Sequence, residues 1–126
     1  MSTIIEVLRD FSARPFSYEN NSDCCAFVGA VVEVFHGHNP MSKFEYKDEK
    51  GAAEIMKKHG TLLGAVVAAL GRPSPIADAQ DGDVLIALQT NDEWILGVVV
   101  GERMAVKTKT GLMDWPIEFA TYRWRP

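Results

Sequence analysis

At residues 22–28 the chain reads Ser22-Asp23-Cys24-Cys25-Ala26-Phe27-Val28. The apolar segment that starts at Ala26 runs to Phe35 with hydrophobic side chains on nearly every side of a helix, and Gly37 is a natural carboxy-terminal stop. Ser22 or Asp23 is expected to cap the amino end of this helix with its side chain. A helix that is apolar all round is normally buried, so this segment predicts the centre of the core.

Cys24 is the candidate functional residue of this stretch. The free amide groups in the first turn of a helix favour negative charge, and therefore favour a reactive thiolate at that place. Free cysteine is also among the most commonly buried residue types, where it behaves as a small hydrophobe, so a core role for Cys24 stays open. Cys25 is rotated by about 100° on the helix, so only one of the two thiols is expected to face a given cleft.

Three segments carry a resemblance to a known family. They are the pattern Asp-Cys-x-x-Phe-Val from Asp23, then Asp81-Gly82-Asp83-Val84-Leu85-Ile86, and then Ile95-Leu96-Gly97-Val98-Val99-Val100-Gly101. With these segments the chain resembles the NlpC-like cell-wall peptidases, a branch of the papain-like fold, over roughly residues 15–126. The resemblance implies one α+β domain over residues 1–126, with a helical part at 1–71 and a small antiparallel sheet at 82–126. It also implies that Cys24 occupies the position of the catalytic nucleophile.

One departure from the family pattern concerns the general base. Active members begin the second strand with His-Val-Gly-Ile, and the aligned position here is Ile95. A slip of one residue offers Trp94 or Leu96, and neither side chain can take a proton. The third polar group of active members would fall near Lys107. The chain therefore keeps the nucleophile position of the family and lacks its histidine.

The three histidines of the chain do not replace this base in an obvious way. A cysteine nucleophile needs its base within hydrogen-bond reach. His36 lies twelve residues further along the same helix, about 18 Å away at 1.5 Å per residue, and His38 follows the end of that helix. His59 ends a different helical segment and is the one not excluded by simple geometry. A solvated imidazole at a helix carboxy terminus is the favoured interpretation of His59.

Neither a metal nor a cofactor is expected from these patterns. Cys24-Cys25 lacks the two-residue gap of a typical zinc-binding pair, and His36-x-His38 alone supplies too few ligands. Two adjacent cysteines rarely form a disulfide, and the start Met1-Ser2-Thr3 lacks the basic residues of a secretory signal. We therefore expect synthesis in the bacterial cytoplasm.

Composition limits the possible functions. The 126 residues, 47% of them hydrophobic, are enough for a single core. The net charge of −4 and the lack of a basic stripe argue against binding to nucleic acid. The longest apolar run, Leu62 to Leu70, is about half of what a membrane-spanning helix needs, so no membrane span is expected.

The order of the expected elements is helices first and strands second, which is typical of α+β proteins. Thr3-x-x-Glu6 predicts a capping box for a first helix that ends at Arg14-Pro15. The charged segment 38–50 is expected to form a surface loop. Two shorter helices are expected at 52–59 and 62–70, and strands at 84–88, 94–100, 103–108, 112–115 and 120–124.

Aromatic residues gather near the carboxy terminus, and they fit either a core or a binding surface. They are Trp115, Phe119, Tyr122 and Trp124. Packing is the favoured interpretation, although aromatic side chains also dominate the hot spots of protein interfaces.

Short single-domain proteins with Asp-Cys near the start, Gly-Asp before the sheet and Trp-Arg near the end resemble a family found mainly in phages and prophages. The resemblance implies a structural or interaction protein of the phage tail, with tail or baseplate proteins as its partners and a final place in the virion tail. The alternative is a cysteine amidase or peptidase that cuts peptidoglycan stem peptides with Cys24 as nucleophile. The missing histidine favours the first function, because removing one member of a nucleophile and base pair costs orders of magnitude in rate.

Overall fold

The computed structural model describes residues 3–126; Met1 and Ser2, cited above for the missing basic start, lie outside the described residues. Helices occupy the first half of the chain: α1 Ile4–Ala13, α2 Cys24–His36, α3 Glu49–Lys58 and α4 Leu62–Leu70, with a short 3-10 helix η1 at Pro40–Lys43. Strands occupy the second half: β1 Val84–Leu88, β2 Trp94–Val100, β3 Arg103–Thr108, β4 Gly111–Trp115 and β5 Tyr122–Trp124, with a 3-10 helix η2 at Ile117–Phe119. The predicted α+β class is confirmed.

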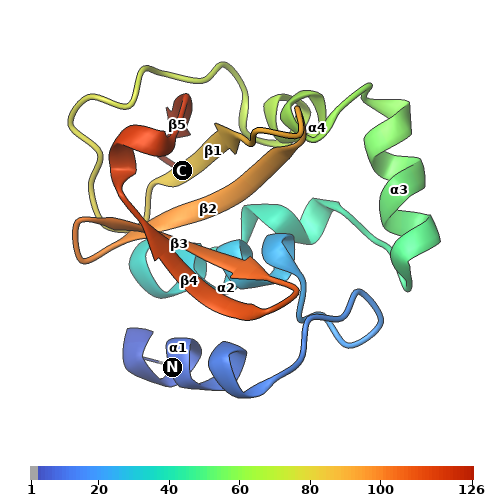
Figure 1. Cartoon of the computed structure of the whole chain (residues 1–126), viewed down its shortest axis with the longest axis horizontal. Helices are drawn as coiled ribbons and strands as arrows, with labels where there is room; N and C mark the ends of the chain where they lie inside the picture. The colour runs from blue at the N-terminus through green and yellow to red at the C-terminus, as the bar shows by residue number, and fades with distance from the viewer. Residues whose placement is uncertain (1–2) are drawn as a thin grey trace.

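The five strands form one antiparallel sheet in the order β4-β3-β2-β1-β5. Sequential hairpins join β1 to β4, and β5 returns across the sheet to pair with β1 (Figure 1). Helix α2 packs against β2 and β3, while α3 and α4 lie to one side of the molecule (Figure 1). The amino end of α2 is thereby held beside the sheet.

The main core lies between α2 and one face of the sheet. Its members from α2 are Phe27, Val28, Val31 and Val32. Val84 and Ile86 of β1, and Leu96 and Val98 of β2, supply the facing side. Phe27 is fully buried and packs edge-to-face on Phe11 of α1 at 5.3 Å between ring centroids. The central position predicted for this helix is confirmed.

The opposite face of the sheet is also covered. Leu85, Ala87, Val99, Met104 and Val106 form a second cluster, over which Ile76, Ala79 and Ile117 pack. The covering segments are the connection from α4 to β1 and the 3-10 helix η2. Because both faces are buried, β2 is apolar at every position and shows no alternation.

The Gly-Asp and Trp-Arg pairs of the sequence meet beside the sheet. Gly82 has φ +85°, a conformation that favours glycine, and a Cβ there would lie 2.7 Å from Cβ of Phe35. Arg125 donates from Nε to Oδ1 of Asp83 at 3.0 Å and from a terminal nitrogen to Oδ2 at 2.9 Å. Trp124 is buried, and its indole nitrogen donates to the carbonyl of Gly71 at 2.9 Å. These contacts fasten the end of the chain to the start of β1.

The charged segment 38–50 is more structured than the sequence predicted. Pro40 and Met41 are buried in η1, because Asn39 caps that turn by accepting from the Met41 amide at 2.9 Å. Helix α3 begins at Glu49, three residues before the predicted start, since the side chain of Asp48 accepts from the Gly51 amide at 2.7 Å. The prediction of a surface loop over the whole segment was therefore wrong.

The carboxy-terminal aromatic residues divide between the two interpretations. Trp124 is a core residue, whereas Phe119 is 61% exposed and Tyr122 lies at the border of exposure. Strand β5 is shorter than predicted, and β4 begins one residue earlier. In the described part of the chain, no helix is both long enough and apolar enough to cross a membrane.

Candidate functional site

Asp23 stands at the amino-terminal cap position of α2 without making a side-chain capping bond. Its Oδ2 instead accepts a hydrogen bond from the hydroxyl of Tyr46 at 2.5 Å. Ser22 makes no capping bond either, and its buried hydroxyl has no hydrogen-bond partner. The prediction that Ser22 or Asp23 caps the helix with its side chain was wrong, because Tyr46 turns the Asp23 carboxylate toward the segment before α3.

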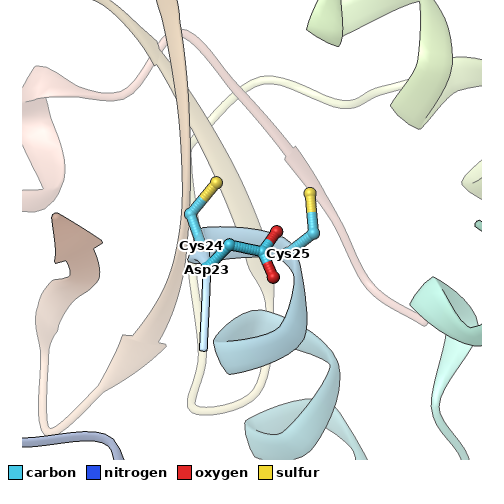
Figure 2. Close-up of side chains that lie close together, drawn as sticks. All are labelled: Asp23, Cys24 and Cys25. Carbon is cyan, nitrogen blue, oxygen red and sulfur yellow. The ribbon is translucent and has the colours of Figure 1, made fainter. Parts of the chain in front are cut away.

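Both thiols face the same cleft. Cys24 and Cys25 line a cleft of about 440 Å³, and neither forms a disulfide. Figure 2 shows the two sulfur atoms on the same side of the helix start, with the carboxylate of Asp23 between the side chains. The expectation that only one thiol faces a cleft was wrong, because side chains in the first turn lean toward the amino end of the helix and reach the space beyond it.

The cleft lies between α2, α3, the start of α4 and the turn from β1 to β2. Tyr18, Phe44, Tyr46, Ile55, Met56 and Trp94 are its large side chains. The charged residues that line it are Asp23, Asp92 and Glu93, and all three are acidic. In the part of the chain that the structure describes, no lysine, arginine or histidine lines this cleft.

Trp94 is the residue of β2 that lines the cleft with Cys24. Successive side chains of a strand point to opposite faces, so Trp94 packs with the α2 core while Ile95 packs with the cluster on the other face. The β2 side chain that lines the cleft is therefore Trp94 and not Ile95, the residue that the resemblance aligned with a histidine. An indole carries a hydrogen-bond donor and no acceptor, so Trp94 cannot act as a base.

The histidines lie elsewhere. His36 lies close to Gly82, its Nε2 3.2 Å from the carbonyl oxygen, and His38 Nδ1 lies 3.4 Å from the carbonyl oxygen of His36. His59 is the carboxy-terminal cap residue of α3 and does not line the cleft. Among residues 3–126, the structure brings no imidazole into the cleft with Cys24.

Lys107 has a different place from the one its alignment implied. Its side chain is buried, and Nζ donates to the carbonyl of Phe11 at 2.6 Å and to the carbonyl of Arg14. Burial, with the nearby Arg14, lowers the pKa of Lys107. The lysine therefore fastens the end of α1 to β3 and does not line the cleft.

The acidic and apolar surroundings act on the other titratable groups of the cleft. A hydrogen bond with Cys24, followed by burial and the charge of Asp23, raises the pKa of Cys25 well above the ordinary range of a thiol. Burial, with Cys24 and Asp23 nearby, raises the pKa of Tyr18 to about 12. Burial also raises the pKa of Tyr46, with Cys25 and the bond to Asp23 adding to the effect. Negative charge is therefore disfavoured on Cys25 and on both tyrosines.

Two polar atoms at the start of α2 lack partners. Oδ1 of Asp23 and the hydroxyl of Ser22 are both buried and accept or donate no hydrogen bond. A buried polar group without a partner costs about 1–3 kcal/mol of stability. Such a group calls for an explanation, and a bound ion or an ordered water is one.

Tyr18, Tyr46, Asp92 and Glu93 are polar cleft residues to which the sequence assigned no functional role. Tyr46 reaches Asp23 over 23 residues of sequence, and the rings of Tyr18 and Tyr46 pack edge-to-face at 6.1 Å. Phe44 and Tyr46 are the phenylalanine and the tyrosine that fall within the charged segment 38–50. That composition was the one signal for a contact with the rest of the fold.

The geometry defines a class of protein: an α+β domain in which a cysteine pair opens the central helix and faces an acidic cleft that, over residues 3–126, holds no imidazole. The chain belongs to the family described as "Domain of unknown function (DUF6950)", which it matches over residues 2–126. No curated protein matches its sequence.

Proposed function

We propose that this protein is a structural or interaction component of a phage or prophage tail, built on an NlpC-like scaffold whose hydrolytic site is impaired. The resemblance of the Asp-Cys, Gly-Asp and Trp-Arg pairs to NlpC-like proteins of phages supports this function. The observation that carries the proposal is the cleft itself: Trp94 is the β2 residue beside Cys24, at the place where the resemblance implies a histidine in active members.

Electrostatics support the loss of hydrolysis. Acyl transfer needs a thiolate and a group that can return a proton to the leaving amine. Asp23, Asp92 and Glu93 line the cleft and disfavour a second negative charge, and no described cation there offsets them. Loss of the base alone lowers the rate by several orders of magnitude.

A gain-of-function variant tests this argument. Trp94→His places an imidazole on the face of β2 that lines the cleft, so we expect Cys24 to react faster with iodoacetamide at neutral pH. Ile95→His is the matched control, since residue 95 points to the opposite face of the sheet. Equal rates for both variants and the natural protein would contradict the geometry on which the proposal depends.

The resemblance implies a contact with a tail or baseplate protein, and some apolar side chains are exposed. Met113 of β4 is 45% exposed and Phe119 of η2 is 61% exposed. Mass spectrometry of purified particles from a phage that encodes this chain should detect it, and Cys24→Ala should leave its incorporation unchanged. Absence of the protein from the particles would exclude a virion component.

The alternative function, a cysteine amidase or peptidase acting on peptidoglycan stem peptides, is supported by one observation. The Cys24 thiol opens into a cleft, and its backbone amide belongs to the first turn of a helix, where it can stabilise an oxyanion. Purified peptidoglycan incubated with the protein should release no stem-peptide fragments. Release that disappears in Cys24→Ala would establish this alternative in place of the structural role.

A further inference from the structure

The start of α2 collects three side chains whose atoms are ligands of soft and borderline metal ions. We propose that Asp23, Cys24 and Cys25 bind one thiophilic divalent cation of the zinc class. The site shares Cys24 with the alternative hydrolytic function, and the two uses exclude each other because binding would occupy the sulfur electron pairs that an acyl transfer needs. The proposal is therefore independent of the proposed place in a tail.

Distances favour a shared ion. One carboxylate oxygen of Asp23 and the sulfur atoms of both cysteines all lie within 4.8 Å of one another. Two sulfur ligands at about 2.3 Å from a tetrahedral zinc ion are about 3.8 Å apart, so small changes in side-chain torsion bring these three atoms onto one ion. Figure 2 shows the three side chains gathered at the helix start.

The buried carboxylate of Asp23 has one oxygen free for a ligand. Asp23 is 1% exposed, and its Oδ1 has no hydrogen-bond partner, although Tyr46 donates to its Oδ2. A ligating carboxylate is commonly held by a hydrogen bond to its other oxygen, which fixes its direction. Tyr46 makes this kind of bond and leaves Oδ1 available for an ion.

Charge complementarity points to a cation. Asp92 and Glu93 also line the cleft, and in the described part of the chain no basic residue does. Thiolates select soft and borderline metals such as zinc over magnesium or calcium. As the metal–sulfur bonds form, each thiol releases one proton to solvent, and the fourth position of the ion opens toward the cleft.

The proposal departs from the expectation that these residues hold no metal. That expectation rested on the missing two-residue gap between Cys24 and Cys25, a spacing typical of zinc sites built on loops. Here adjacent residues converge because both belong to the first turn of α2. The third donor is the cap residue Asp23, which no cysteine spacing reveals.

Cobalt is the spectroscopic probe for the test. Titration of the reduced protein with Co²⁺ should produce one thiolate-to-cobalt charge-transfer band that saturates at one ion per chain. Zn²⁺ should displace the cobalt and should slow the alkylation of both cysteines by iodoacetamide. Lack of a charge-transfer band in the natural protein would overturn the proposal whatever the variants do.

Variants assign the donors. Cys24→Ser, Cys25→Ser and Asp23→Asn should each weaken Zn²⁺ binding by about tenfold or more in competition with a chromophoric chelator. The asparagine side chain of Asp23→Asn keeps an oxygen acceptor for Tyr46, so circular dichroism should report an intact fold. The control variant His38→Gln/His59→Gln should bind as the natural protein does. Unchanged binding in Asp23→Asn, or loss of binding in the histidine control, would overturn the three-residue site.

Discussion

Asp23 and Asp83 are both buried aspartates beside the sheet, yet their surroundings differ. Asp83 receives two hydrogen bonds from Arg125 and a third from the amide of Gln80 at 2.9 Å. Asp23 receives one bond, from the neutral hydroxyl of Tyr46, and its Oδ1 has no partner. The carboxylate at the Gly-Asp pair is fully satisfied, whereas the one at the Asp-Cys pair is not.

The difference separates two roles for residues that carry the same resemblance. A buried charge with a cation and several donors holds the fold together. A buried charge left partly unsatisfied lowers stability, and binding an ion would relieve that cost. The Gly-Asp and Trp-Arg pairs are bound into the fold, whereas the Asp-Cys pair leaves a carboxylate oxygen without a partner, as the proposed cation site requires.

The largest expected effect comes from Asp83→Ala, which removes the three hydrogen bonds that Asp83 accepts from Arg125 and Gln80. We expect the free energy of unfolding in urea to fall by about 2–3 kcal/mol, since bonds to a buried charge are stronger than neutral ones. Asp114→Ala is the matched control, because its ion pair with Arg103 is long, at 3.6 Å, and exposed. The control should change stability by less than about 0.5 kcal/mol. Equal losses of unfolding free energy in the two variants would contradict a structural role for Asp83.

Alkaline pH is expected to lower the free energy of unfolding by a smaller amount. It acts on Tyr18, which lines the cleft with the two cysteines. The pKa of Tyr18 is raised from 10.0 in the unfolded chain to about 12 in the folded protein. Above pH 10 the unfolded chain loses this proton first, so the stability contributed by neutral Tyr18 is present below pH 10 and is lost as pH rises toward 12. Urea unfolding at several pH values should show this decrease, and Tyr18→Phe should reduce it. If the free energy of unfolding fell as steeply with pH in Tyr18→Phe as in the natural protein, Tyr18 would not be the source of the decrease.

The smallest effect is expected from Asp23→Asn in metal-free buffer. Removing an unpaired buried charge while keeping an acceptor for Tyr46 should leave the free energy of unfolding within about 0.5 kcal/mol of the natural protein, or raise it. Thermal and urea unfolding with a chelator present measure the change. A loss above about 1 kcal/mol would show that Asp23 stabilises the fold as Asp83 does, and would contradict the difference proposed between the two aspartates.

The sequence predicted the order of the elements because local signals determine them. Apolar runs bounded by turn residues located β1, β2 and β3, and Gly37 located the end of α2. The start of α3 was missed because charged residues fill its first turn, although Asp48 is a cap residue of the usual kind.

The candidate site was predicted less completely, because its decisive contacts join distant segments. Both faces of β2 are buried, so its uniform apolar sequence carries no alternation that could assign Trp94 rather than Ile95 to the cleft. The bond from Tyr46 to Asp23 replaces a local capping bond that sequence rules favour. Cys24 itself lies where the sequence placed it, at the start of the central helix.

The reactivity of Cys24 tests the proposed loss of hydrolytic chemistry most directly. The measurement is the rate of alkylation of Cys24 by iodoacetamide at about pH 6, made in Cys25→Ser with a chelator present so that neither the second thiol nor a metal contributes. We expect Cys24 to be alkylated no faster than a small-molecule thiol in solution. A rate far above that value would show a stabilised thiolate in the cleft and would contradict the account.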